Sequence, residues 1–398
     1  MNNTPFGRRA ALLTGATVFA SPAILRAQND PIKVATLTPL TGAGGPYGPP
    51  MAKVAAAVAA EVNAAGGVLG RKIEVVSEDD QTNPDAGVRA ARKLIDVDKV
   101  AAIMGTWASA VTTAVAPLCW ESKTFLTTVS GADSITLLPH QGYLVRTQPN
   151  SHLQISHIAE FILSMGAKRV FTVIPQTPFT QVTIEIMNDV LSKGGATHNS
   201  LIYDDKKTTF RTEVDQALRT NPDFILCNGY TPDSVVMLKD LYRAGYKGKI
   251  VGLAYSINQK LIDQIGQPEV VEGIYTFAPS PAEGSDAYER AKKLSGLEKP
   301  DPYTCQVYDH TNMVLMAMAA AKATTGTAIK DNIRKICQGG GKSVDNALDG
   351  LKAIAAGEKV DYTGASGPCD FDDKGDILNC KFRYEQIKGG KFNLLKIA

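Results

Sequence analysis

The chain has 398 residues, of which 44% are hydrophobic and 21% are charged, and its formal net charge is +2. This is a globular composition, long enough for two or three domains. The charge is near neutral and no basic tail is present, so the sequence gives no electrostatic basis for binding nucleic acid or anionic lipid.

The first 27 residues have the layout of an export signal. Arg8 and Arg9 precede the apolar run 10–20, and small residues around Ala27 offer a cleavage site. The adjacent arginines look like a twin-arginine signal, and an ordinary secretory signal is the alternative. No later segment approaches the ~20 apolar residues of a membrane span. The sequence therefore predicts a periplasmic protein whose mature chain is not embedded in the membrane.

Short apolar runs then alternate with helical patterns, which favours βαβ units and parallel sheets. We expect a first block of strands at 32–37, 72–77, 100–104, 125–128 and 143–148, with helices at 51–65, 85–97 and 109–119. We expect a second block of strands at 169–174, 197–203, 224–228 and 250–252, with helices at 152–164, 180–192, 212–219 and 234–244.

The pattern changes after about residue 279. Helices are expected at 286–297, 303–323, 328–337 and 344–355, followed by hairpin-like material at 369–384 and 391–397. Two similar α/β blocks followed by a helical tail predict two lobes, with a hinge near residues 148–150. Ligands on such sheets bind beyond the carboxyl ends of the strands.

Six cysteines follow the leader, and none of them forms a C-x-x-C pair. Cys369 and Cys380 flank a turn-rich segment, so we expect them to form a disulfide across a hairpin. Cys119 and Cys227 lie in apolar runs and are expected to be buried thiols. The state of Cys305 and Cys337 is left open.

The motifs of common cofactor and catalytic sites are missing from the sequence. Tyr47 stands where a dinucleotide fingerprint needs its last glycine, and prolines around it remove backbone donors. The acidic run 78–80 is interpreted as a cap or turn. We find no nucleophile–base pair and no metal-ligand spacing, so neither a cofactor nor a metal is expected and the chain is not expected to be an enzyme.

Polar and aromatic residues instead follow the predicted strands. Ser109 opens a helix after the third strand, where it is either an N-cap or a donor to a bound anion. Further residues in such loops are Trp107, Val129, Gly131, Phe179, Tyr230 and Tyr255, and Tyr47 lies in the loop after the first strand. Together they would form an apolar box closed by a carboxylate clamp.

From residue 31 to the end, the chain resembles the periplasmic solute-binding proteins of ABC transporters of the branched-chain amino-acid type. The resemblance rests on segments in the family's order: 32–42, Tyr47-Gly48, 63–71, 78–84, 103–109, Arg146-Thr147, Gly229-Tyr230 and 364–368. It implies the type I fold, an α/β architecture with two doubly wound Rossmann-like lobes joined by three crossovers. The expected boundaries are 28–149 with 279–358 for lobe 1, and 150–278 with 359–398 for lobe 2.

The resemblance also implies roles for single residues. Ser109 matches a hydroxyl that binds the ligand carboxylate, and Val129 and Gly131 match positions that offer a backbone carbonyl and N–H. Phe179 and Tyr230 match aromatic positions of the second lobe. The implied partner is an inner-membrane ABC permease, which receives the trapped ligand.

Two departures from the family pattern bear on the ligand. Gly131 replaces the usual Thr or Ser, and Ala254 stands where an acidic residue usually pairs the ammonium of an amino acid. An unpaired ammonium is costly in a closed cleft. We therefore expect a simple organic acid, aromatic or otherwise apolar.

Three alternatives stay open on the sequence alone. The ligand could be a branched-chain or related amino acid whose ammonium is served by Asp309 or Glu78. The protein could feed a membrane receptor as a sensor. It could also be an exported enzyme on a similar fold, although no catalytic pair supports this.

Overall fold

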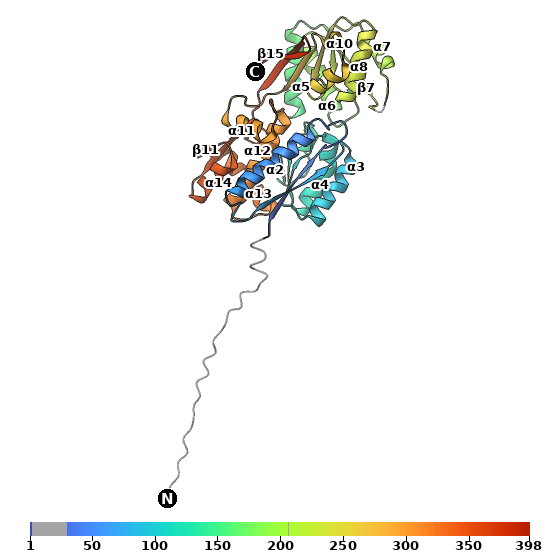
Figure 1. Cartoon of the computed structure of the whole chain (residues 1–398). Coiled ribbons are helices and arrows are strands. Elements are labelled where there is room, and N and C mark those ends of the chain that lie inside the picture. Colours follow the sequence, from blue (N-terminus) through green and yellow to red (C-terminus); the bar gives the residue numbers. More distant parts are fainter. Residues whose placement is uncertain (2–29, 206) are drawn as a thin grey trace.

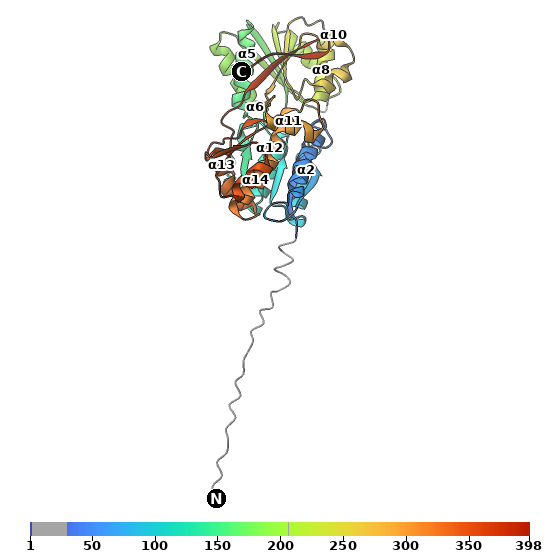
Figure 2. The same cartoon turned by 60° about the vertical axis from the view of Figure 1, so that its left-hand side comes forward.

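The computed structural model describes residues 30–205 and 207–398, together with residue 1. The predicted leader and its cleavage site lie outside the described residues. Two lobes lie one above the other, and the C-terminal strand belongs to the lobe remote from the start of the described chain (Figures 1 and 2). No helix in the described part is long and apolar enough to span a membrane.

The first lobe is built on a parallel five-stranded sheet of order β2-β1-β3-β4-β5. Its strands are β1 (Ile32–Thr38), β2 (Ile73–Asp79), β3 (Ala102–Gly105), β4 (Phe125–Thr128) and β5 (Leu144–Arg146). Helices α3 (Pro84–Arg92) and α4 (Ser109–Ser122) pack together, and α2 (Gly48–Ala64) packs against α12 (Pro302–Ala321). The sheet is thus covered on both faces, as a doubly wound fold requires.

The second lobe is a seven-stranded sheet of order β15-β14-β10-β9-β8-β6-β7. Its parallel part contains β6 (Arg169–Pro175), β7 (Thr197–Tyr203), β8 (Phe224–Cys227), β9 (Lys249–Leu253) and β10 (Tyr275–Pro279). The antiparallel strands β14 (Phe382–Lys388) and β15 (Lys391–Ile397) complete one edge. Two apolar clusters, one on each face, bury the sheet beneath its helices.

Helix α5 (Ser151–Ser164) precedes the first parallel strand of the second lobe, and the lobe's other helices occur between its parallel strands. They are α6 (Thr180–Lys193), α7 (Arg211–Leu218), α8 (Thr231–Arg243), α9 (Gln259–Ile265) and α10 (Pro268–Val271). Local caps set where several begin, since Asn150 accepts from the N–H of Leu153 at 2.9 Å and Asn258 accepts from that of Leu261 at 3.0 Å. The strand β10 and the helices α9 and α10 were not predicted from the sequence.

The chain returns to the first lobe after β10. Helices α11 (Asp286–Ser295), α13 (Gly326–Gln338) and α14 (Ala347–Ala355) join α12 there, with a small sheet of β11 (Lys342–Val344), β12 (Val360–Gly364) and β13 (Gly367–Pro368). The first-lobe core continues through Val360 and Tyr362 to Ile377. The last crossing therefore lies near residues 378–381, whereas the sequence suggested 359, because this apolar segment packs against α12 and α13.

The predicted disulfide is wrong: Cys369 and Cys380 are both free thiols. The expected hairpin exists, but it narrows to one bridge between Phe371 and Ile377 and a hydrogen bond from the Leu378 N–H to the Asp370 carbonyl. Beyond Asp370 and Leu378 the two arms of the hairpin separate. Cys369 is buried in the first core, whereas Cys380 packs against the second, so the sulfurs belong to different lobes.

Candidate ligand-binding site between the lobes

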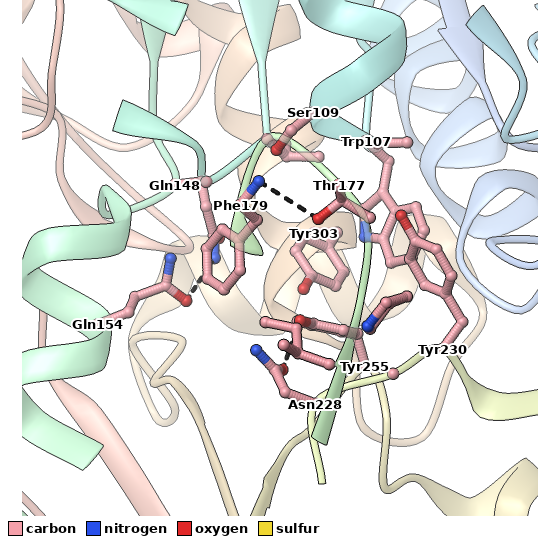
Figure 3. Close-up of a pocket in the computed structure, with 16 residues that line it drawn as sticks. Trp107, Ser109, Gln148, Gln154, Thr177, Phe179, Asn228, Tyr230, Tyr255 and Tyr303 are labelled. Carbon is pink, nitrogen blue, oxygen red and sulfur yellow. Dashed lines mark hydrogen bonds between the residues drawn. The ribbon is translucent and has the colours of Figure 1, made fainter. Parts of the chain in front are cut away.

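A pocket with a cavity volume of about 60 Å³ lies between the two lobes. Seven of the eight predicted site residues line it, namely Trp107, Ser109, Val129, Gly131, Phe179, Tyr230 and Tyr255 (Figure 3). The structure also brings in residues that the sequence analysis missed: Gln148, Gln154, Thr177, Asn228 and Tyr303. The pocket lies beyond the carboxyl ends of β3, β4, β6 and β8, where a ligand is expected on such sheets.

The first lobe provides hydrogen-bond donors at one end of the pocket, the Ser109 hydroxyl and the Gly131 N–H, which together form a donor pole. Ser109 is the first residue of α4, while Ala108 is its N-cap and has no capping side chain. Ser109 Oγ accepts from the N–H of Ala132 at 3.2 Å, which leaves the hydroxyl hydrogen free to donate. The N–H of Gly131 has no partner among the described residues. A helix N-terminus with free N–H groups attracts anions, so this pole suits a carboxylate.

Aromatic rings form the walls of the pocket. Trp107 is at their centre, with ring-centroid separations of 5.6 Å to Tyr230, 5.8 Å to Tyr303 and 6.0 Å to Tyr255. Burial raises the pKa of Tyr230, Tyr255 and Tyr303, so these hydroxyls stay neutral. Rings at these separations offer faces and edges to a flat apolar ligand.

Tyr47 is the predicted site residue that does not line the pocket. Its ring stacks on that of Trp107, with the ring centroids 5.5 Å apart. Its hydroxyl donates to the carbonyl of Ala254 at 3.1 Å and accepts from Asn258 Nδ2 at 2.8 Å. Tyr47 belongs to the first lobe and both partners to the second, so it ties the lobes together. Ala254 faces a separate cavity of about 230 Å³.

The second lobe and the crossover add amides. Gln154 Nε2 donates to the carbonyl of Pro149 at 2.6 Å, and its Oε1 accepts from Gln148 Nε2 at 3.1 Å. Gln306 Nε2 in turn donates to Gln148 Oε1 at 2.8 Å. The amides of Gln148 and Gln154 are therefore held in place by the segment that joins the lobes. A glutamine near a predicted hinge does not by itself indicate a place in a ligand pocket, so the sequence did not predict Gln148 or Gln154 as lining residues.

No described residue that lines the pocket carries a charge. The two acids considered as partners for an ammonium are engaged elsewhere. Asp309 accepts hydrogen bonds from Tyr362, Ala365 and Ser366, and burial raises its pKa to about 6. Glu78 pairs with Lys93. The described lining of the pocket therefore provides hydrogen-bond donors for an anion but no carboxylate for an ammonium group.

Comparisons with known proteins agree with this architecture. The Leu/Ile/Val-binding protein of Escherichia coli K12 is 25% identical over 378 residues, covering 94% of each chain. The branched-chain amino acid transporter substrate-binding protein LivJ of Streptococcus pneumoniae, solved with isoleucine, has a TM-score of 0.77 at 20% identity, covering 92% of this chain and 99% of its own.

A second kind of ligand occurs among the similar structures. A solute-binding protein of an ABC transporter from R. palustris, solved with benzoate, has a TM-score of 0.74 at 17% identity, covering 92% of this chain and 96% of its own. The sequence model of the periplasmic binding protein family matches residues 31–391, almost all of the described chain. The chain therefore belongs to the periplasmic binding protein family.

Proposed function

We propose that this chain is the exported ligand-binding subunit of an ABC importer, and that it traps a small aromatic or other apolar carboxylate between its lobes without catalysis. The observation that carries the proposal is the pocket itself. It combines a donor pole at Ser109 and Gly131 with walls of aromatic rings, and none of its described lining residues is charged.

The mechanism follows from the position of the pocket. The first lobe would hold the carboxylate, and closure would bring the rings of Phe179 and Tyr230 onto the apolar part of the ligand. Hinge closure around a ligand is a common device in two-lobed binding proteins. The closed form would dock on an inner-membrane permease, and residues 1–27 would direct export to the periplasm.

A branched-chain or related amino acid is the second candidate, favoured by the relatives that bind Leu, Ile and Val. In this pocket the carbonyl of Val129, which has no donor among the described residues, would have to serve the ammonium. A lone neutral acceptor compensates a buried ammonium poorly. A sensor role would use the same pocket and differ only in the membrane partner.

A thermal-shift screen of the chain against aromatic acids and amino acids tests the proposal. A ligand that binds only the folded state raises the melting temperature. We expect stabilisation by benzoate-like acids and none by leucine. Stabilisation by leucine alone would reverse the ranking of the two candidates, and conversion of the bound compound into a product would establish an enzyme.

A further inference from the structure

One buried side-chain polar atom among the described residues that line the pocket has no hydrogen-bond partner. Asn228 directly follows β8 and is 1% exposed. Its Oδ1 accepts from the Tyr255 hydroxyl at 2.6 Å, but its Nδ2 is buried without a hydrogen-bond partner. No other described residue that lines the pocket has a buried side-chain polar atom in this state. Most buried donors in proteins are paired, so an unpaired donor on a residue that lines a ligand pocket is a candidate partner for an acceptor atom of the ligand.

The orientation of this amide is fixed by Tyr255. Burial raises the pKa of Tyr255, so the hydroxyl keeps its hydrogen and needs an acceptor, which Asn228 Oδ1 provides. Turning the amide over would leave both the Tyr255 hydrogen and the amide oxygen without partners. The atom that is free to meet a ligand is therefore a donor, which is the wrong polarity for an ammonium.

Asn228 lies at the other end of the pocket from the donor pole formed by Ser109 and Gly131. Figure 3 shows Ser109 and Asn228 at opposite ends of the pocket, with the rings of Phe179 and Tyr303 between them. The two ends also come from different lobes. A flat ligand whose carboxylate meets Ser109 would therefore present its opposite edge to Asn228 Nδ2.

We propose that Asn228 is a specificity-determining residue that binds an oxygen acceptor on the far edge of the ligand ring. The cargo would then be an aromatic acid bearing a hydroxyl or carbonyl oxygen remote from its carboxylate. This inference rests on the proposed function, because it needs the carboxylate at Ser109. An acid with an apolar far edge leaves the donor unpaired when the cleft closes, and such a loss is strongly discriminated against.

The test compares ligands of matched size on the unaltered chain. Calorimetry would give the Kd of 3- and 4-hydroxybenzoate and of 3- and 4-methylbenzoate, since a methyl group fills about the space of a hydroxyl and accepts no hydrogen bond. We expect the hydroxy acid to bind about ten-fold tighter than its methyl partner at one or both ring positions. This measurement needs no variant, so it stands even if a substitution impairs folding.

The variant Asn228→Leu then assigns the preference to this side chain. We expect it to abolish the hydroxyl preference while retaining binding of the methyl acids. Asn188→Leu is the matched control: it makes the same change in the second lobe at a residue that contacts His198 and does not line the pocket, so the preference should survive in it.

The outcomes separate the two levels of the proposal. Equal affinity for hydroxy and methyl acids, or a preference that persists in Asn228→Leu, would overturn the role of Asn228 and leave the proposed function intact. Loss of the preference in Asn188→Leu as well would also overturn its assignment to Asn228. If no aromatic acid binds while leucine does, the proposed function fails and this inference fails with it.

Discussion

Gly131 shows how one missing side chain shapes the pocket. A Cβ at this position would lie 3.1 Å from Phe179 Cε2 and 3.0 Å from Gln154 Nε2. Its backbone is not in the left-handed region, so glycine is not needed there for conformational reasons. The absence of a side chain instead makes room for the Phe179 ring. A side chain at this position would require Phe179 and Gln154 to shift.

At this scale the sequence predicted Ser109 and most of the aromatic wall, but not Asn228 or Tyr303. Ser109, Phe179 and Tyr230 were predicted because each follows a strand or opens a helix. Asn228 was assigned to the end of a strand, and Tyr303 to a core helix, where an aromatic is ordinary. A hydrogen-bond donor that lacks a partner is a property of the folded chain, so no pattern of residues could have indicated it.

Ser109→Ala should weaken binding of the carboxylate ligand by about 1.5–3 kcal/mol, because a charged acceptor loses its donor. Calorimetry would measure the change. Thr113→Ala is a suitable control, since the Thr113 hydroxyl donates to the Ser109 carbonyl at 2.8 Å within α4 and does not line the pocket. Unchanged affinity in Ser109→Ala would remove this hydroxyl from the site.

Asp80→Asn should stabilise the fold above pH 7. Burial raises the pKa of Asp80 to about 7, and its Oδ2 is buried without a partner. Between about pH 4 and 7 the folded chain holds a proton that the unfolded chain has lost, so this carboxyl makes stability fall as pH rises through that window. We expect a gain of roughly 1–2 kcal/mol at pH 8, measured by denaturant unfolding, and none at pH 4.

The neighbouring acid provides a control of opposite sign. Burial of Asp79 is outweighed by hydrogen bonds from the Thr41 hydroxyl and from backbone N–H groups, and its pKa is lowered. Its contribution to stability is therefore present at neutral pH and lost in acid. Asp79→Asn should lower the free energy of unfolding at pH 7 and have little effect at low pH. If both variants changed the free energy of unfolding at neutral pH in the same direction, the opposite pKa shifts assigned to Asp79 and Asp80 would be wrong.

At the scale of elements, most strands and helices could be predicted, because apolar runs alternate with helical periodicity along both lobes. The C-terminal region was predicted only in part: hairpin-like material was expected at 391–397, which is β15, but its partner β14 was not recognised. The sequence suggested a hairpin over 369–384, whereas the ladder forms between β14 and β15 around the turn at Gly389-Gly390. Turn residues near Lys374 predicted a longer hairpin ladder. The ladder stays short because Cys369 packs in the core of the first lobe and Cys380 packs against that of the second.

Arg146 shows how the elements beneath the site are joined. Its side chain is fully buried at the end of β5, and Nε donates to Asp376 Oδ1 at 2.8 Å. Nη1 donates to the carbonyl of Ala132 at 2.6 Å, in the loop that carries Gly131. The guanidinium therefore fastens the pocket loop and the 371–377 hairpin to the same strand end.

Asp376→Ala should destabilise the protein by roughly 3–5 kcal/mol, because it leaves a buried guanidinium without its counter-charge. Denaturant unfolding would measure the loss. Asp189→Ala is the matched control, since Asp189 pairs with Lys193 at 2.7 Å on the surface and should contribute less than about 1 kcal/mol. Equal losses of the free energy of unfolding in the two variants would show that burial does not make the Arg146–Asp376 pair more important than a surface pair.

At the scale of the whole molecule, two lobes share a chain that crosses between them three times. The sequence predicted both lobes, but the last crossing and the inter-lobe contacts depend on which segments pack together. Tyr47 illustrates this, because it was expected in the ligand site and instead bridges the lobes through Ala254 and Asn258.

Tyr47→Phe should therefore weaken ligand binding without altering the pocket wall. The substitution keeps the ring that stacks on Trp107 and removes two hydrogen bonds between the lobes, worth about 1–2 kcal/mol. We expect a faster ligand off-rate and a larger radius of gyration without ligand, measured by stopped flow and X-ray scattering. An unchanged off-rate would show that the hydroxyl does not hold the lobes together.

The lack of charge in the pocket has a consequence for how binding responds to salt. Attraction between exposed charged groups weakens as ionic strength rises, whereas the neutral donors that line this pocket would hold a carboxylate through hydrogen bonds and carry no net charge for ions to screen. The Kd of the ligand should therefore change little with the salt concentration.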